Sequence, residues 1–130
     1  MNLTLKRGFF SGLVILVMGI GINMGIQVLF PSIAFEYQNT ALFRPFSDPL
    51  MMIFFAYPFV FGMVAAYLWE KLSKPKPAEF AKIYFLIATI PGMFATFTSF
   101  NISLAMVLVW TFTGYIEALA AGYVFARVKK

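Results

Sequence analysis

The sequence contains no cysteine and no histidine, and only 12% of its residues are charged. Without cysteine there is no disulfide framework and no thiol nucleophile, and without either residue type the chain lacks the side chains that most often bind zinc, haem iron or iron–sulfur clusters. We therefore expect no cofactor and no metal site. The low charge, combined with high hydrophobicity, also excludes intrinsic disorder.

What the sequence has instead is apolar residues, which make up 62% of its 130 positions. A bilayer core about 30 Å thick requires roughly 20 mainly apolar residues of helix, and such runs occur at about 8–30, 49–68, 80–97 and 104–125. The first run follows a basic pair, as in a signal peptide, but it is too long for one and should be retained. The sequence therefore predicts an all-α integral membrane protein, a four-helix bundle of two hairpins that forms one transmembrane domain over 1–130.

Lysine and arginine are distributed unevenly over the connections. Nine of the ten basic residues precede the first span, lie between the second and third, or follow the fourth, and only Arg44 lies on the other side. Connections rich in these residues stay in the cytoplasm. We therefore expect both termini to be cytoplasmic, in a multi-pass protein of a bacterial-type inner membrane. This distribution explains the net charge of +5, so the bilayer and its anionic headgroups, and not nucleic acid, are the expected partner.

The connections carry recognisable helix start and stop signals. Asp48-Pro49 is typical of a helix start and predicts that the second span begins there, and Ser103 is the predicted N-cap of the fourth. The prolines of 74–77 favour an extended turn between the hairpins. The aromatic-rich segment 31–47 should lie at the headgroup interface, either as an anchor or as an outer lid, with Arg44 and Asp48 forming a surface ion pair.

Prolines also occur inside two spans. Pro58 and Pro91 each remove a backbone donor, so the second and third helices should kink and leave the carbonyls of Phe54 and Ile87 without their usual partners. In transporters such breaks expose backbone oxygens to substrate. Proline is also tolerated in membrane helices for structural reasons alone, and that interpretation is favoured for this chain.

Small and polar residues indicate which helix faces pack, because helices in lipid associate through close backbone approach and hydrogen bonds. On the first span Gly8, Gly12, Gly19, Asn23 and Gln27 lie within a stripe roughly 100° wide, which should face the bundle. Further packing positions are expected at Gly62 and Ala66 in the second span, Thr89, Gly92 and Thr96 in the third, and Gly114, Ala118 and Gly122 in the fourth. Gly21 and Gly25 lie on the opposite side of the first span and imply a second partner, either another copy or another membrane protein.

Glu117 is the only carboxylate or base deep within a predicted span. A charge at that depth costs about 2.5 to 3.5 kcal/mol, so the carboxyl group must be paired, hydrated or protonated. The spans offer it no lysine, arginine or histidine. The expected partners are neutral groups, namely Tyr84, Thr89 and Thr113, with Asn23 and Gln27 completing a candidate intramembrane polar site.

These features leave three functional hypotheses. The leading one is a non-enzymatic structural or accessory component that acts through helix packing, with Glu117 as a protonated hydrogen-bond donor. The alternative is a proton-coupled carrier of a small molecule or lipophilic cation, in which Glu117 exchanges a proton. An enzyme acting on lipid is the least favoured, because the carboxylate has no base partner, metal ligands, phosphate-binding loop or Ser–His pair beside it.

Overall fold

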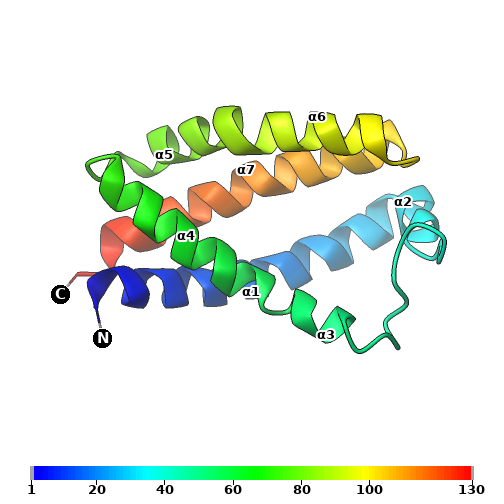
Figure 1. Cartoon of the computed structure of the whole chain (residues 1–130), viewed down its shortest axis with the longest axis horizontal. Coiled ribbons are helices and arrows are strands. Elements are labelled where there is room, and N and C mark those ends of the chain that lie inside the picture. Colours follow the sequence, from blue (N-terminus) through cyan, green and yellow to red (C-terminus); the bar gives the residue numbers. More distant parts are fainter. Residues whose placement is uncertain (1, 130) are drawn as a thin grey trace.

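A computed structural model describes residues 2–129, and over this range the chain is helical with no strand (Figure 1). Four helical segments are long and apolar enough to cross a membrane, at Leu3–Leu29, Met51–Lys71, Pro77–Ser99 and Leu104–Arg127. The predicted all-α class with four long apolar helices is confirmed. The first and third segments begin earlier than predicted, because Asn2 caps the first and Pro77 occupies the first turn of the third, where its missing N–H needs no partner.

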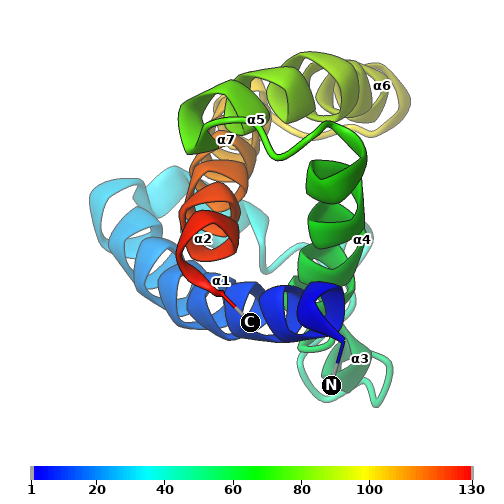
Figure 2. The same ribbon diagram turned by 90° about the vertical axis from the view of Figure 1, so that its left-hand side faces the viewer.

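The four segments form two hairpins, as predicted. Helix α1 (Leu3–Leu29) packs along α4 (Tyr57–Lys71), while α7 (Leu104–Arg127) packs along α5 (Pro77–Tyr84), η1 (Phe85–Thr89) and α6 (Ile90–Ser99). Contacts between α1 and α7 join the hairpins. Both ends of the described chain and the turn between the hairpins lie at the same end of the molecule (Figures 1 and 2). We call this the inner end and the opposite one the outer end.

The main core lies toward the inner end. It is built from large apolar side chains of all four segments, with small residues between them. Its members are Ile15, Phe61, Ala65, Ala66, Trp69, Phe80, Ala81, Ala118, Ala121 and Phe125. Aromatic rings meet edge to face within it, as in the pair Phe80 and Phe125, whose centroids are 5.9 Å apart. Such pairs add stabilisation beyond the area that they bury.

Both spans that contain an internal proline depart from regular α-helical geometry just before it. In the second span α3 (Met51–Phe54) ends before Pro58, which lies in the first turn of α4. In the third span the π-helix η1 precedes Pro91, and the N–H of Ile90 donates to the carbonyl of Phe85, five residues back. The wider π turn accommodates the proline where a regular turn would lose a hydrogen bond.

The connections are partly as predicted. Ser103 caps α7 by accepting a hydrogen bond from the N–H of Met106 (3.1 Å). Lys76 is extended before α5, and Ser73 and Lys74 take left-handed backbone conformations with φ of 60° and 59°. The predicted helix start at Pro49 is wrong by two residues. Turns occupy 47–50 and α3 begins at Met51.

Asp48 explains this late start, because its side chain stabilises a turn. One carboxylate oxygen accepts from the N–H of Leu50 (2.9 Å) and the other from Arg44 (2.8 Å). The backbone N–H of Leu50, followed by the guanidinium of Arg44, lowers the pKa of the Asp48 carboxyl group. The predicted ion pair between Arg44 and Asp48 is therefore confirmed, although Asp48 is not the cap of a long helix.

The aromatic-rich outer connection folds back onto the start of α7. Helix α2 (Pro31–Glu36) buries Ile33, and Glu36 accepts a hydrogen bond from the N–H of Ser103 (2.7 Å). Tyr37 accepts a hydrogen bond from the Trp110 ring N–H, and the rings of Phe43 and Trp110 meet edge to face. This segment covers the outer end of the second hairpin.

Small residues stand at the contacts where the helices stay close together. A Cβ added at Gly62 would lie 2.6 Å from the Ser11 hydroxyl oxygen and 3.0 Å from the Gly12 nitrogen. The remaining predicted contacts of this kind pair Gly8 with Met63, Gly12 with Phe59, Gly114 with Thr89, and Gly122 with Pro77. Ala66 and Ala118 are fully buried.

The prediction fails at other positions. A Cβ added at Gly19 or Gly92 would have nothing within 4 Å, and Asn23 and Gln27 are exposed. Within this chain the stripe on α1 therefore packs only through its inner half, where all buried residues of the helix lie, none beyond Ile15. The reason is the course of the second span, which crosses α1 through α4, so that α3 lies away from α1 (Figure 1). Thr96 donates to the carbonyl of Gly92 in its own helix.

Candidate functional site

Glu117 lies in the middle of α7 and is only 8% exposed. The hydroxyl group of Tyr57, the first residue of α4, donates a hydrogen bond to its Oε2 atom (3.1 Å). The predicted partners are therefore wrong. Thr113 donates to the carbonyl of Val109 in its own helix, and Thr89 packs against Gly114. Tyr84 lies close enough to Glu117 to interact with it electrostatically, without a hydrogen bond.

Sequence reasoning missed Tyr57 for a physical reason. The break before α4 rotates this residue relative to the preceding turn, so the regular 100° spacing does not place it. One signal was present, since Tyr57 carries the only hydroxyl group in the run 50–58. A hydroxyl group within a lipid-facing segment requires a partner, and a buried carboxyl group is a suitable one.

Aromatic rings surround this pair. The Phe61 ring lies 6.1 Å from the Tyr57 ring and 5.2 Å from the Tyr84 ring, the latter edge to face. On the other side of Tyr57 the Phe54 ring is stacked at 6.1 Å. Phe54 is 63% exposed and Tyr57 45% exposed, so the row of rings leads from the outer surface to the carboxyl group.

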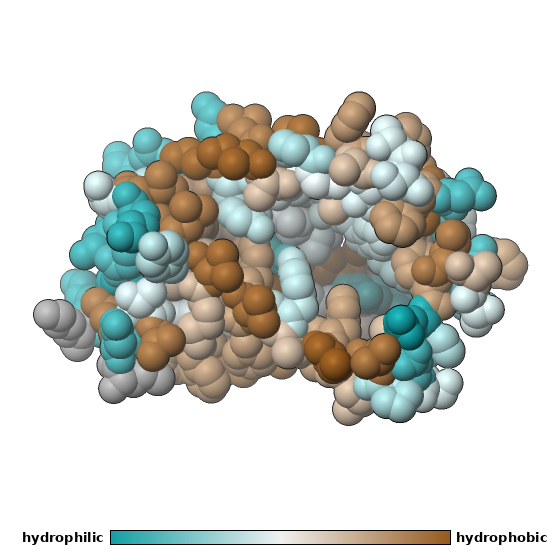
Figure 3. Space-filling view, viewed as in Figure 1, coloured by the Kyte–Doolittle hydropathy of each residue, from teal (hydrophilic) through white to brown (hydrophobic). Residues whose placement is uncertain are grey.

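The second carboxylate oxygen of Glu117, Oε1, accepts no hydrogen bond from the described residues. Over the same residues no enclosed side-chain oxygen or nitrogen lacks a partner, so Oε1 must be reachable from outside. The surface is hollowed between α3–α4 and α6 on the face shown in Figure 3. The site is therefore a buried carboxyl group with one oxygen bonded to a tyrosine and the other accessible.

Asn23 and Gln27 do not join this site. They lie on the outer half of α1, where the Gln27 amide donates to the Asn23 side-chain oxygen (2.6 Å). Both are exposed and one helical turn apart. The predicted polar constellation thus separates into a buried carboxyl–tyrosine pair and an exposed pair of amides.

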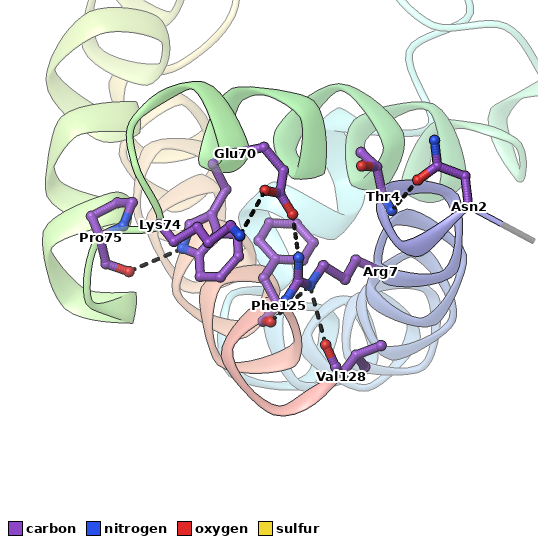
Figure 4. A network of polar contacts seen from close by, with 9 residues as sticks. Asn2, Thr4, Arg7, Glu70, Lys74, Pro75, Phe125 and Val128 are labelled. Carbon is purple, nitrogen blue, oxygen red and sulfur yellow. Dashed lines mark hydrogen bonds and ion pairs between the residues drawn. The ribbon is translucent and has the colours of Figure 1, made fainter. Parts of the chain in front are cut away.

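A third polar cluster lies at the inner end and was not predicted (Figure 4). Arg7 is 6% exposed, and its guanidinium donates to the carboxylate of Glu70 and to the backbone oxygens of Phe125 (3.0 Å) and Val128 (3.2 Å). It also lies 4.8 Å from the centre of the Trp69 ring. From the sequence, Arg7 was interpreted only as an orientation signal. The clue to its role was the pair of opposite charges at the inner ends of the first and second spans.

The described residues contain no group of three or more acidic side chains that could hold a metal ion. Comparison with protein-family models, with curated proteins and with solved structures finds no match to this chain. The function must therefore be inferred from the geometry of these three clusters.

Proposed function

We propose that this small membrane protein has a non-enzymatic structural or accessory role and acts by associating with another transmembrane helix through the outer half of α1. The observation that carries the proposal is the uncovered glycine-rich surface there. Gly21 and Gly25 lie on one face of α1, and a Cβ added at either would have nothing within 4 Å. In lipid, such surfaces allow the close backbone approach through which helices associate.

The exposed amides lie on the opposite face of the same half of α1 and show that this face, too, is left uncovered by the described residues. Asn23 and Gln27 satisfy only one donor and one acceptor between them, and an amide side chain has two donors and can accept two hydrogen bonds. The hydrocarbon core offers no water to the remaining donors and acceptors. A neighbouring helix that supplies polar groups would therefore bind here more favourably. A second copy of this chain is the occupant that fits best at the Gly21–Gly25 face, because two such faces, one from each copy, can approach each other closely.

In this proposal both termini are cytoplasmic, and the membrane is of the bacterial inner type. The supporting observation is electrostatic. Of the ten basic residues, eight lie within 6–7, 71–82 and 127–129, which are at the inner end, and short basic connections stay in the cytoplasm. Anionic headgroups would attract this end of the molecule.

Cross-linking tests the association. The chain has no cysteine, so a single cysteine in place of Val28, which is 78% exposed on the Gly21–Gly25 face, reports contact with a second copy. We expect Val28→Cys in bilayers to form a disulfide-linked dimer, and Gly21→Leu with Gly25→Leu to abolish it without unfolding the chain. Val60→Cys on α4, which is 60% exposed, is the matched control and should not cross-link. A monomer in bilayers, or a dimer unchanged by both leucines, contradicts the proposal.

The second candidate function is a proton-coupled carrier, and the accessible oxygen of Glu117 favours it. Glutamine resembles glutamate in shape but cannot release a proton in the physiological range. In proteoliposomes the carrier hypothesis predicts uptake of lipophilic cations that depends on a pH gradient and that Glu117→Gln abolishes. Equal and negligible uptake by both proteins contradicts the carrier for these substrates.

A further inference from the structure

We propose that Glu117, Tyr57, Phe61 and Tyr84 form a binding site for an amphipathic organic monocation that enters from the bilayer between the second and third spans. The proposal shares Glu117 with the carrier candidate. It requires only binding, and neither transport nor association through α1.

The charge of Glu117 is not balanced within the described part of the chain. The ion pairs there join Arg7 to Glu70, Lys74 to Glu70 and Arg44 to Asp48, so none involves Glu117. A carboxylate in this position without a cation carries a desolvation cost that protonation or a bound cation removes. The chain supplies one hydrogen-bond donor, the hydroxyl group of Tyr57, to only one of the two oxygens. The other oxygen is free to face a ligand.

The surroundings of Glu117 suit an organic cation better than a metal ion. Calcium requires six to eight oxygen ligands and magnesium a near-octahedral set, whereas this site offers one carboxyl group and the hydroxyl groups of Tyr57 and Tyr84. Aromatic faces attract cations, and they also pack against apolar substituents. Phe61 lies between Tyr57 and Tyr84, with ring centroids 6.1 and 5.2 Å from its own. A cation with an apolar body would satisfy both the charge and the rings.

The spans leave a route from the bilayer to the site. Helix α4 lies on α1 and α7, whereas α6 lies on η1 and α7. Toward the outer end α3 and α6 lie apart (Figure 1). Figure 3 shows the surface hollowed between them. The exposed ring of Phe54 is stacked on the ring of Tyr57, whose hydroxyl group donates to Glu117. An amphipathic molecule already dissolved in the bilayer could therefore reach Glu117 without crossing a polar barrier.

The test measures equilibrium binding of tetraphenylphosphonium to the full chain in phosphatidylcholine nanodiscs, which carry no net lipid charge. We expect saturable binding to the wild type and at least about a 30-fold loss of affinity in Glu117→Gln, since removing one member of a buried charge pair has effects of that order. Tyr57→Phe keeps the ring and should stay within about 3-fold of the wild type, whereas Tyr57→Leu should lose about 2- to 30-fold.

Two controls separate the site from general partitioning. Glu79→Gln removes an exposed carboxylate from the first turn of α5 and should leave binding unchanged. Tetraphenylborate has a similar body with the opposite charge, so its partitioning should be the same in wild type and Glu117→Gln. Wild-type binding no stronger than that of the Gln variant, or an equal loss in Glu79→Gln, overturns the proposal.

A measurement on the wild type keeps the proposal testable if a variant does not fold. A hydrophobic carbodiimide modifies carboxyl groups within membranes, and mass spectrometry locates the product. Tetraphenylphosphonium should slow modification of Glu117, and tetraphenylborate should not. An unchanged rate overturns the proposal. Binding without uptake in proteoliposomes would support the site and contradict the carrier candidate alone.

Discussion

Arg7 shows how much of the inner end depends on a single side chain. A positive charge near the start of α1 is unfavourable for that helix, whose N-terminus already carries a partial positive charge. The guanidinium instead reaches the C-terminal end of α7, where the oxygens of Phe125 and Val128 accept from it, and it also contacts Glu70 and the Trp69 ring (Figure 4). Arg7 therefore satisfies helix-end carbonyls and joins α1, α4 and α7.

Replacing Arg7 should weaken the fold, by an amount that depends on which hydrogen bonds the new side chain can still donate. Arg7→Ala leaves two carbonyls without this donor and Glu70 with only Lys74 as its partner. We expect it to lower the free energy of unfolding by about 2 to 3 kcal/mol. Arg7→Lys keeps the charge but not the planar fork, and should lower it by about 1 kcal/mol. Titration with sodium dodecyl sulfate in mixed micelles measures both. Lys6→Ala is the control for charge alone, and an equal destabilisation by Lys6→Ala would contradict the role of the Arg7 hydrogen bonds.

The limits of sequence reasoning are also visible at this scale. The sequence predicted that Glu117 lies deep within a span, because it stands in an apolar run and such runs are recognised from composition alone. Its hydrogen-bond partner did not follow, because Tyr57 comes immediately after the break at 55–56 and a break changes the rotational position of every later side chain. Arg7 was missed since its burial depends on three helix ends meeting in space.

At the scale of the element, close approach and interruption explain the helices. Gly62 allows α4 to approach the backbone of α1, since an added Cβ would collide with the carbonyl oxygen of Gly8 and the hydroxyl oxygen of Ser11. Beyond the break at 55–56 this approach ends. The spacing of small residues predicted the contact correctly, but the same spacing at Gly19 and Gly92 predicted contacts that do not form within the chain. Spacing identifies a face that can pack, and the path of the neighbouring helix decides whether it does.

A pair of alanine substitutions tests this explanation. Gly62→Ala inserts a methyl group against backbone and hydroxyl atoms, and overpacking of this kind costs about 1 to 3 kcal/mol of unfolding free energy. Gly92→Ala makes the same chemical change where nothing lies within 4 Å, so it should be neutral or slightly stabilising, by up to about 1 kcal/mol from helix propensity. Both are measured by the same titration. Equal effects of the two substitutions would show that the approach of α4 to α1 is not close in the membrane.

At the scale of the molecule, the two hairpins meet through α1 and α7, and this arrangement separates two kinds of surface. The inner end has the core and the Arg7 cluster, whereas at the outer end the spans diverge and leave the amides on α1 and the opening toward Glu117. Span number and pairing could be predicted, because each depends on local composition and short connections. Which half of α1 would be covered could not, because it depends on how the second span crosses α1 in space (Figure 1).

Orientation in the membrane is the prediction on which the other proposals at this scale depend. The absence of native cysteine makes the test direct. Ser73 lies in the turn between the hairpins at the inner end, and Asn39 lies in the outer connection; both are exposed. We expect Ser73→Cys to react with a membrane-impermeant maleimide only after the cytoplasmic side is opened, because four of the basic residues lie between 71 and 82 and hold this turn on that side. Asn39→Cys should react in intact cells. Both variants should react in detergent, which controls for local accessibility.

Labelling of both sites from the same side would contradict the four-span arrangement. Opposite sides with the reverse assignment would keep the four spans and place the Arg7 cluster, and the basic face around it, outside the cytoplasm.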